Sequence, residues 1–378
     1  MSNYNLSIVV VTRNDNHGLN LNERTNRFID SCSYMSLKHK VFIELIIVEW
    51  NPPKTNDSLD KLISGMLPNN NQYLTTRIIT VPQKVHKQFK NSRNLHLFQM
   101  IGKNVGVRRA KGEFILATNI DIIFSDEIFI NIKKGLKKNT LYRSIRVDVP
   151  EDFAFIQNSE LLLKSCMKSF HTINYRFGTY VINNNSIMRK FNFLPFYFCI
   201  NFYLIAFIFN RLYKSIFNLF SKYKFKKISI IKLKNFFFPK KKSGSVFLKI
   251  HILNCYLFCN ACGDFTLMDK KSWLKVNGYV EWPIYSIHID SLLLYQAYYQ
   301  KIRIKNFSNA AIFHIDHAIG SGYSIDGEKI LFSNLKKRSI PFISYKKYNA
   351  SVEKIKNNKL FLRKNWGLKL NEFKEKLL

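Results

Sequence analysis

Acidic residues are scarce in this sequence. Its 378 residues include 59 Lys and Arg but only 25 Asp and Glu, which gives a formal net charge of +34. This basic excess excludes an ordinary acidic cytosolic enzyme and indicates a polyanionic partner. The candidate classes of partner are nucleic acid, an anionic membrane and phosphorylated substrates. No Asp or Glu occurs from Leu161 to Gly263, so much of the excess lies in the middle of the chain.

Cysteine is also scarce, with six residues in the whole chain. That number does not resemble the disulfide framework of a secreted protein and favours a reducing compartment. The amino terminus lacks a basic segment followed by an apolar one, so we expect no cleaved signal and a cytoplasmic location. The spacing of four residues is compatible with a zinc site, namely His251, Cys255, Cys259 and Cys262. The residues between them are apolar, which favours buried free thiols over zinc binding.

The chain contains one long uncharged run, although 47% of its residues are apolar and full-length disorder is thereby excluded. Phe191 to Asn210 carries no charge, and a basic, aromatic-rich stretch from Arg211 to Lys242 follows it. The length suits a membrane span, but Asn, Pro and many aromatic residues favour a segment lying in an anionic membrane interface. We therefore expect peripheral membrane attachment, with a single span and a buried helical hairpin as alternatives.

Buried strands and helices alternate over the first 150 residues. The two apolar, β-branched runs nearest the amino terminus are typical of parallel strands buried on both faces. The expected elements are a strand over Leu6–Val11, a helix over Asn22–Met35, strands over Val41–Glu49 and Arg77–Val81, a helix over Lys103–Ala110 ending at Gly112, and a strand over Phe114–Thr118. This order predicts an α/β fold with a Rossmann-like, doubly wound sheet, whose ligands bind beyond the carboxyl ends of the strands.

A second α/β segment follows the basic region. Its expected elements are a strand over Asp264–Met268, a helix over Lys270–Val276 with Asp269 as N-cap and Gly278 at its left-handed end, a helix over Ile289–Tyr299, and a strand over Ala311–Ile315. The sequence thus predicts an α/β domain made from 1–150 and 259–325, an insertion over 151–258, and a basic carboxyl-terminal tail over 326–378. Neither a P-loop nor a Gly-x-Gly-x-x-Gly motif is present.

Polar residues follow the predicted strands of the first half. Thr12-Arg13-Asn14 comes after the first strand, Glu49 closes the second, and Asn119-Ile120-Asp121 follows a later one. A carboxylate at such a strand end can hold a divalent cation against a diphosphate, with Arg108 or Arg109 neutralising the remaining charge. The alternative interpretation of the first cluster is turn chemistry and helix capping.

The second half contributes another polar cluster. Its members are Asp264, Glu281, Asp290, His314 and His317. Glu281 or Asp290 could remove a proton from an attacking hydroxyl. His314 could bind a metal from a neighbouring strand, although a single histidine in such a place is more often a packed core residue.

In this order and spacing the motifs resemble family-2-like glycosyltransferases with the GT-A fold. The segments Leu6–Asn14, Val48–Asn51 and Lys103–Asp121 look like the half of these enzymes that binds the nucleotide sugar. The segments Cys262–Phe265, Gly278–Trp282 and His288–Asp290 look like the acceptor half. The resemblance covers about residues 5–150 and 259–325.

The resemblance implies a role for individual residues of the nucleotide half. Thr12, Arg13 and Glu49 match positions that hold the nucleobase and ribose. Asn104 and Arg108 match positions that line the nucleotide pocket.

It also implies a metal site and a catalytic base. Asn119-Ile120-Asp121 occupies the Asp-x-Asp position, where Asp121 would bind Mn²⁺ or Mg²⁺ and Asn119 could accept a ribose hydroxyl. His314 matches a late histidine that completes the metal site in some related enzymes. Asp290 matches the base of the Glu-Asp pair, although Ile289 replaces the Glu.

The activity implied is a metal-assisted, inverting glycosyltransferase of the hexosyltransferase type (EC 2.4). It would move a sugar from a nucleotide diphosphate to a hydroxyl of a glycan or lipid-linked acceptor in polysaccharide biosynthesis. The alternative is a non-catalytic protein that binds a membrane or polyanion and merely retains the sugar-nucleotide fold, against which Asp121 and Asp290 argue. Nucleic acid is disfavoured as a partner, because much of the basic charge follows the apolar run instead of interleaving with aromatic residues on a groove.

Overall fold

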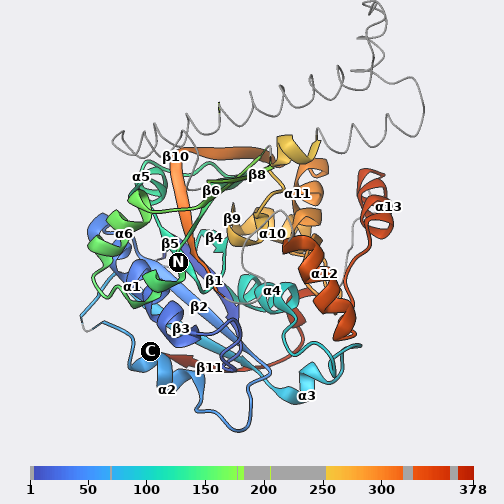
Figure 1. Ribbon diagram of the computed structural model, residues 1–378, viewed down its shortest axis with the longest axis horizontal. Helices are drawn as coiled ribbons and strands as arrows, with labels where there is room; N and C mark the ends of the chain where they lie inside the picture. Colours follow the sequence, from blue (N-terminus) through green and yellow to red (C-terminus); the bar gives the residue numbers. More distant parts are fainter. Residues whose placement is uncertain are drawn as a thin grey trace, which may run out of the picture.

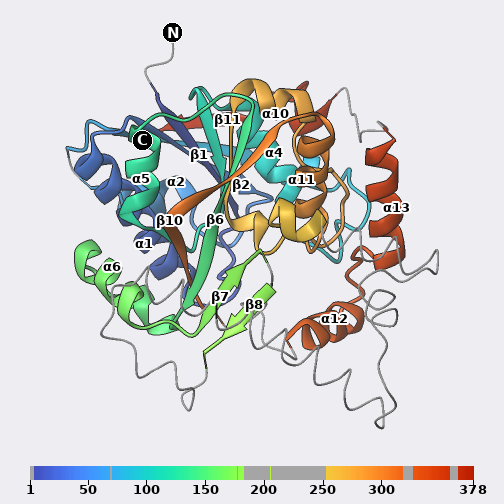
Figure 2. The same cartoon turned by 90° about the horizontal axis from the view of Figure 1, so that it is seen from above.

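One mixed β-sheet runs through the molecule with helices on both faces (Figure 1, Figure 2). The structure is a computed structural model that describes residues 4–68, 70–176, 178–182, 253–317, 327–357 and 365–378, together with Ile205. The described strands are β1 (Leu6–Thr12), β2 (Ile43–Trp50), β3 (Leu74–Val81), β4 (Phe114–Ala117), β5 (Ile122–Phe124), β6 (Thr140–Val149), β7 (Thr172–Tyr175), β8 (Gly178–Val181), β9 (Thr266–Asp269), β10 (Arg303–Ile315) and β11 (Lys374–Leu377). They lie in the order β11-β3-β2-β1-β4-β9-β6-β10-β5, and β7 and β8 branch from β6.

Helices connect these strands and cover the two faces. The described ones are α1 (Leu21–His39), α2 (Leu59–Ser64), α3 (Gln83–His86), α4 (Gln99–Arg109), α5 (Asp126–Lys133), α6 (Ser159–Lys168), α10 (Lys270–Val276), α11 (Ile289–Tyr299), α12 (Gly327–Lys337) and α13 (Tyr345–Lys356). The short 3₁₀ helices are η1 (Glu151–Phe155), η3 (Cys262–Asp264) and η4 (Trp366–Leu368). The helices α1, α5 and α6 lie on one side of the sheet, and α4, α10 and α11 lie on the other (Figure 2).

The apolar runs became strands buried on both faces, as predicted. Along β1, Ile8 and Val10 belong to the core under α1 and α5, whereas Val9 and Val11 belong to the core under α4. The four strands β1 to β4 are joined by parallel pairing, β3-β2-β1-β4. The α/β class predicted from the sequence is therefore confirmed, and the carboxyl ends of these strands meet at one edge.

The sheet departs from the fully parallel arrangement in its second half. β9 lies between β4 and β6 and runs antiparallel to both. Gly112 also differs from its predicted role, because α4 ends on an extended Ala110. A Cβ at Gly112 would lie 2.6 Å from the backbone nitrogen of Ser7, so this glycine lets the chain pass close to the start of β1.

Other predicted elements appear where they were expected. α11 spans Ile289–Tyr299, and Asp269 caps α10 by accepting a hydrogen bond from the backbone nitrogen of Ser272 (3.0 Å). Asn277 and Gly278 both adopt left-handed backbone conformations at the end of α10.

Two predicted boundaries were wrong. Part of the expected insertion belongs to the fold, because η1, α6, β7 and β8 lie within 151–182 and β7 pairs with β6. The region expected to be a basic tail also belongs to it, since β11 pairs antiparallel with β3. The predicted membrane segment 191–242 lies outside the described residues, apart from the single residue Ile205. Among the helices that the structure describes, none has the length and apolarity needed to cross a membrane.

Candidate functional site

The carboxyl ends of β1 and β2 place two predicted residues side by side. Thr12 and Glu49 are register partners, and both are buried. The Glu49 carboxylate accepts hydrogen bonds from the backbone nitrogen of Leu59 and from the Thr80 hydroxyl, each at 3.3 Å. Burial, the largest influence, raises the pKa of Glu49. The Thr12 hydroxyl has no hydrogen-bond partner in the part of the chain that the structure describes.

Arg13 shapes the loop beside this edge. Its Nε donates to the carbonyl of Asn51 (2.8 Å), and its guanidinium also pairs with Asp15. The Asn51 side chain donates to the carbonyl of His96 (3.1 Å), but its Oδ1 has no partner among the described residues. A buried oxygen without a partner costs free energy unless a ligand or water meets it. Asn51 and Thr12 thus each place at the strand ends an oxygen that has no partner within the described structure. The sequence alone assigns Asn51 no role.

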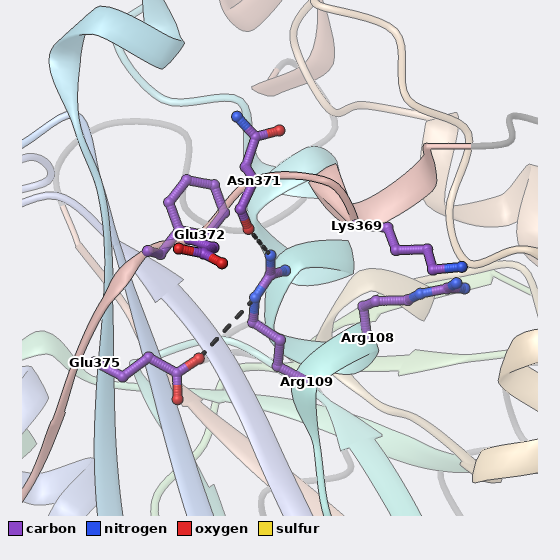
Figure 3. A pocket seen from close by; sticks show the side chains of 7 residues that line it. Arg108, Arg109, Lys369, Asn371, Glu372 and Glu375 are labelled. Atoms are coloured by element: carbon purple, nitrogen blue, oxygen red, sulfur yellow. Dashed lines mark hydrogen bonds and ion pairs between the residues drawn. The ribbon is translucent and has the colours of Figure 1, made fainter.

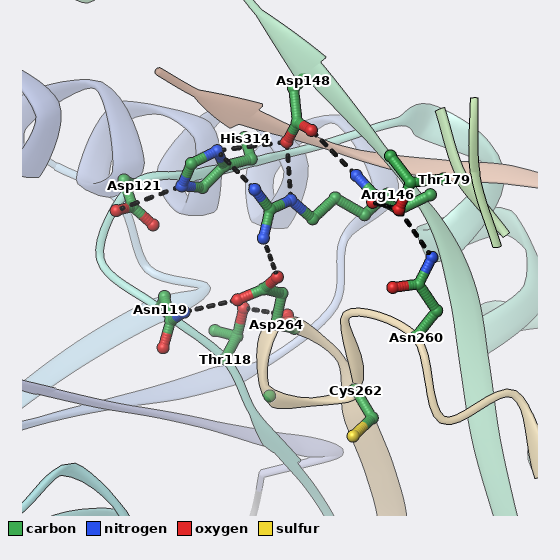
Figure 4. Close-up of polar contacts among 12 residues, drawn as sticks. Thr118, Asn119, Asp121, Arg146, Asp148, Thr179, Asn260, Cys262, Asp264 and His314 are labelled. Atoms are coloured by element: carbon green, nitrogen blue, oxygen red, sulfur yellow. Dashed lines mark hydrogen bonds and ion pairs between the residues drawn. The ribbon is translucent and has the colours of Figure 1, made fainter. Parts of the chain in front are cut away.

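Asp121, His314 and His317 form a cluster of possible metal ligands, in which Asp121 and His314 are buried and His317 is partly buried. Figure 4 shows Asp121 beside His314. Asp121 Oδ2 lies 3.3 Å from His317 Nε2 and 3.7 Å from His314 Nε2, and Arg24 donates to the same oxygen at 3.2 Å. The possible ligand atoms of Asp121, His314 and His317 all lie within 4.8 Å of one another. The other oxygen, Asp121 Oδ1, is buried and has no partner in the described structure.

This donor set fits a divalent cation. Carboxylate oxygen suits Mn²⁺ and Mg²⁺, whereas the two imidazoles favour a transition metal, so the set fits Mn²⁺ better than Mg²⁺. The structure brings together Asp121 and His314, the two predicted ligands. His317 stood in the predicted polar cluster without an assigned role, and its signal was the spacing His314-Ile-Asp-His317. Arg24 had no sequence signal.

The charges of this cluster stabilise one another. Burial favours the neutral acid, yet His314 and His317 hold the pKa of Asp121 well below its usual value. Burial and Arg146 lower the pKa of His314, but Asp121 and Asp148 outweigh them and raise it to about 9. Asp121 is therefore ionised at neutral pH, and a metal at His314 must displace a proton.

Arg146 connects the Asp121–His314–His317 cluster to Asp264 in η3 (Figure 4). Its Nε donates to Asp148 Oδ1 (2.6 Å), its Nη1 donates to Asp264 Oδ2 (2.5 Å), and its Nη2 lies 3.1 Å from His314 Nδ1. Asp148 also lies 3.2 Å from His314 Nδ1 and accepts a hydrogen bond from Asn174 (2.8 Å). Such a network fixes the orientation of a ligating histidine.

Asn119 is held by the protein itself. Its Oδ1 accepts hydrogen bonds from Lys103 Nζ (2.7 Å) and Gln99 (2.9 Å), and its Nδ2 donates to Asp264 (2.5 Å). The amide oxygen of Asn119 therefore already has two donors within the protein, and its side chain joins the end of β4 to η3. The expected hydrogen bond from a ribose hydroxyl to Asn119 stays a prediction.

Lys103 links this strand end to the predicted base. The fully buried ammonium also donates to the carbonyl of Gly263 (2.7 Å). A Cβ on Gly263 would lie 2.9 Å from Asp290 Oδ2, so Asp290 packs directly against this glycine. Burial lowers the pKa of Lys103 to about 8, although Asp264, Asp290 and Asp121 oppose the shift. Asp290 therefore lies at the same edge of the sheet as the Asp121–His314–His317 cluster.

The side chains of Glu281 and Asn104 form hydrogen bonds within the protein. Asn104 is fully buried, donates to the carbonyl of Tyr279 (2.8 Å) and to Glu281 (3.0 Å), and accepts from the Tyr279 nitrogen (2.8 Å). Glu281 also accepts from the backbone nitrogen of Gly367 (2.6 Å). These contacts tie α4 to the loop after α10 and to η4. Both side chains thus have a framework role, and the roles expected for Asn104 in a nucleotide pocket and for Glu281 as a base stay predictions.

Arg108 lies in a separate cavity of about 510 Å³ (Figure 3). Its guanidinium sits 4.6 Å from the ring of Trp366, and the cavity is lined by the end of α4 and the segment before β11. Arg109, its neighbour, donates to the carbonyls of Gly367, Leu368 and Asn371. The predicted role of Arg108 in a nucleotide pocket is therefore not supported by its position.

Comparison with known proteins gives only distant matches. No protein-family model and no curated protein matches the sequence. Among solved structures, TarS of S. aureus (residues 1–349) has a TM-score of 0.40 and 9% identity over 94% of this chain and 70% of that one. Its complex with UDP-GlcNAc gives 0.39 and 10% over 94% and 71%. GalNAc-T7 with UDP, GalNAc and Mn²⁺ gives 0.38 and 9% over 97% and 56%.

Proposed function

We propose that this protein is a glycosyltransferase with a GT-A-type fold that transfers a sugar from a nucleotide diphosphate to an acceptor hydroxyl. The observation that supports this most strongly is the Asp121–His314–His317 cluster at the carboxyl edge of the sheet. In it Asp121 Oδ1 is buried and has no hydrogen-bond partner among the described residues. A divalent cation bound there would supply Lewis-acid stabilisation for a departing diphosphate. Thr12 Oγ1 and Asn51 Oδ1, which have no hydrogen-bond partner among the described residues, could accept hydrogen bonds from the nucleoside.

Asp290 is the proposed base. It removes the proton from the acceptor hydroxyl while the new bond forms at the anomeric carbon and the bond to the donor phosphate oxygen breaks. A single displacement of this kind inverts the anomeric configuration. Lys103 and the carbonyl of Gly263 connect the Asp290 region to the end of β4, so both halves of the site rest on one buried hydrogen-bond network.

The proposed acceptor is a glycan or lipid-linked carrier in polysaccharide biosynthesis, and the proposed location is the cytoplasmic face of a membrane. The support is compositional: the uncharged run over 191–210 and the basic stretch to 242 combine apolar anchors with cations. These residues, except Ile205, lie outside the described part of the chain.

The test is a screen of UDP-, GDP- and TDP-sugars for release of the nucleoside diphosphate in the presence of Mn²⁺. We expect one donor class to be hydrolysed slowly and Asp121→Ala to abolish both turnover and donor-dependent Mn²⁺ binding. Asn119→Ala, which removes a neighbouring contact but no charged ligand, should keep measurable turnover. Full wild-type activity in excess chelator would remove the metal from the proposal.

The rival function is a non-catalytic protein that retains a sugar-nucleotide fold. Calorimetric donor binding without any turnover, under conditions where Asp290→Asn binds equally well, would favour that rival. Absence of both binding and turnover with every donor would contradict the proposed function itself.

A further inference from the structure

The surface formed by α12, α13 and the segment between them is basic, and we call it the α12–α13 surface. Its exposed cations are Lys329, Lys336, Lys337, Arg338, Lys346 and Lys354. In the described part of the chain none of the six forms an ion pair. The acidic residues between 327 and 357 are Glu328 and Glu353, and Glu353 pairs with Lys356 at 3.4 Å. These like charges repel one another and have no ion-pair partner among the described residues, which favours an external anion.

This surface lies beside the helix that carries the proposed base. α13 packs against α11 through a hydrogen bond between Tyr348 and Ser291 (3.0 Å), and both views show the two helices on the same side of the molecule (Figure 1, Figure 2). The backbone nitrogen of Tyr285, in the loop before α11, donates to the carbonyl of Pro341, between α12 and α13 (2.8 Å). Asp290 is in the first turn of α11.

Aromatic rings lie at the start of α11 and at the start of α13. His288, two residues before Asp290, lies 5.5 Å from the ring of Tyr345, whose side chain is 58% exposed. Lys347 places its ammonium 4.3 Å from the ring of Trp282. Flat aromatic faces pack against the apolar faces of sugar rings, whereas neighbouring cations attract acidic substituents. The combination suits a chain that is both a carbohydrate and an anion.

We propose that the α12–α13 surface binds the acceptor and that this acceptor is a polyanionic glycan carrying phosphate or carboxylate groups. The proposal rests on the proposed function and adds the chemical class of the acceptor to it. An anionic membrane is the less favoured partner, because the large apolar side chains that are mostly exposed on this surface are Ile330 and Tyr345. Shallow insertion normally needs a continuous apolar face.

The experiment compares two triple charge reversals of equal charge. Lys336→Glu, Lys337→Glu and Arg338→Glu form the test variant. The matched control is Lys133→Glu, Lys134→Glu and Lys137→Glu, a group of exposed cations at the end of α5 and after it. Each protein is titrated with polygalacturonate as an anionic glycan and with dextran as a neutral one, and is sedimented with phosphatidylglycerol vesicles. Because all six side chains are exposed, we expect both variants to fold, which thermal melting would verify.

The wild type should bind polygalacturonate more weakly as salt rises and should not bind dextran. The test variant should lose at least about tenfold in affinity, equivalent to about 1.4 kcal/mol, while the control stays within about twofold. The neutralising variant Lys336→Gln, Lys337→Gln and Arg338→Gln should fall between them. Equal losses in both reversals would overturn the proposal in favour of a net-charge effect. A test variant that loses vesicle binding but keeps polygalacturonate binding would overturn it in favour of a membrane.

Donor titration separates this proposal from the function on which it rests. Binding of the nucleotide sugar in the presence of Mn²⁺ should be unchanged in the test variant, because none of its three residues contacts the Asp121 cluster. If the wild type bound no donor at all, the proposed function would fail, and the acceptor role would fail with it even if polygalacturonate still bound. If donor binding were intact and polygalacturonate did not bind, only the acceptor proposal would fail.

Discussion

Asp290 and Glu281, the two candidates for the base, differ in what surrounds them. Asp290 lies at the start of α11, against Gly263, and its Oδ1 accepts a hydrogen bond from the backbone nitrogen of Ser291 (2.9 Å). Glu281 is buried and accepts hydrogen bonds from Asn104 and Gly367. A base must be able to meet the acceptor hydroxyl, and Asp290 fits that requirement better.

Asp290→Asn should therefore keep donor affinity and lose transfer by on the order of 10²–10⁴-fold. The measurement is single-turnover transfer alongside donor titration. Glu281→Gln is the comparison: the hydrogen bonds from Asn104 and Gly367 both end on Glu281 Oε1, an acceptor that Gln keeps. It should therefore lower the free energy of unfolding by no more than about 1 kcal/mol and preserve transfer by the folded protein. Normal transfer by Asp290→Asn, with loss in Glu281→Gln, would reverse the assignment.

Lys103 gives a prediction about pH. Its folded pKa of about 8 lies below the usual value, so the folded protein binds fewer protons than the unfolded chain between pH 8 and about 10.4. Stability rises with pH wherever the unfolded state binds more protons. The unfolding free energy of the wild type should therefore increase across that window relative to Lys103→Met. Denaturant titrations at several pH values would measure this increase in the unfolding free energy. Parallel pH profiles for the two proteins would contradict the lowered pKa of Lys103.

At the scale of elements, the carboxyl-terminal segment completes the sheet. β11 covers the outer edge of β3, and Glu375 lies 3.6 Å from Arg77. η4 contributes the backbone nitrogen of Gly367 to Glu281 and its carbonyl to Arg109. A segment that reads as a basic tail thus supports both the sheet edge and α4.

Removing residues 374–378 should expose the edge of β3. We expect the free energy of unfolding to fall by about 1–3 kcal/mol and aggregation to increase, since an open strand edge can pair with another chain. Urea denaturation and light scattering would measure the two effects. Lys376→Met is the control, because its ion pair with Asp60 (2.7 Å) is partly exposed and should contribute no more than about 1 kcal/mol. An unchanged stability in the truncated protein would show that β11 adds little to the sheet.

At the scale of the whole molecule, the basic charge occupies more than one place. Part of it lies on the α12–α13 surface, and part lies between Arg211 and Lys242, outside the described residues. Membrane attachment through the latter is separable from acceptor binding through the former, because the two involve different residues.

The protein should sediment with anionic vesicles and not with neutral ones. Each cation near an anionic surface contributes roughly 1 kcal/mol, and the Debye length falls from about 10 Å at 0.1 M salt to about 3 Å at 1 M, so high salt should release it. Replacing 191–242 by a Gly/Ser linker should abolish sedimentation and leave donor hydrolysis intact. Retention after a carbonate wash would favour a membrane span, and failure of the deletion to fold would favour a buried hairpin.

The sequence by itself determined six of the eleven described strands and several helices, and it proposed part of the site. Unbroken β-branched runs cannot be solvated on either face, so β1, β2 and β4 could be placed from the pattern alone. Asp121 and His314 were proposed as metal ligands because each lies at a predicted strand end. The structure places Asp121 Oδ2 3.7 Å from His314 Nε2, and their binding of a metal stays a prediction. Asp269 could be assigned as an N-cap because that contact joins residues three apart.

Tertiary structure alone decided the remaining roles, because they depend on partners distant in the chain. Asn104 and Glu281 became framework residues through Tyr279 and Gly367, and hydrogen bonds of that range leave no local pattern. Arg24 reaches Asp121 across 97 positions, and Lys103 reaches Gly263 across 160. A buried polar group is stable only if the fold brings it a hydrogen-bond partner. Composition and spacing could therefore propose these side chains for a chemical role. Only their tertiary contacts distinguish residues that can bind a ligand from residues that stabilise the framework.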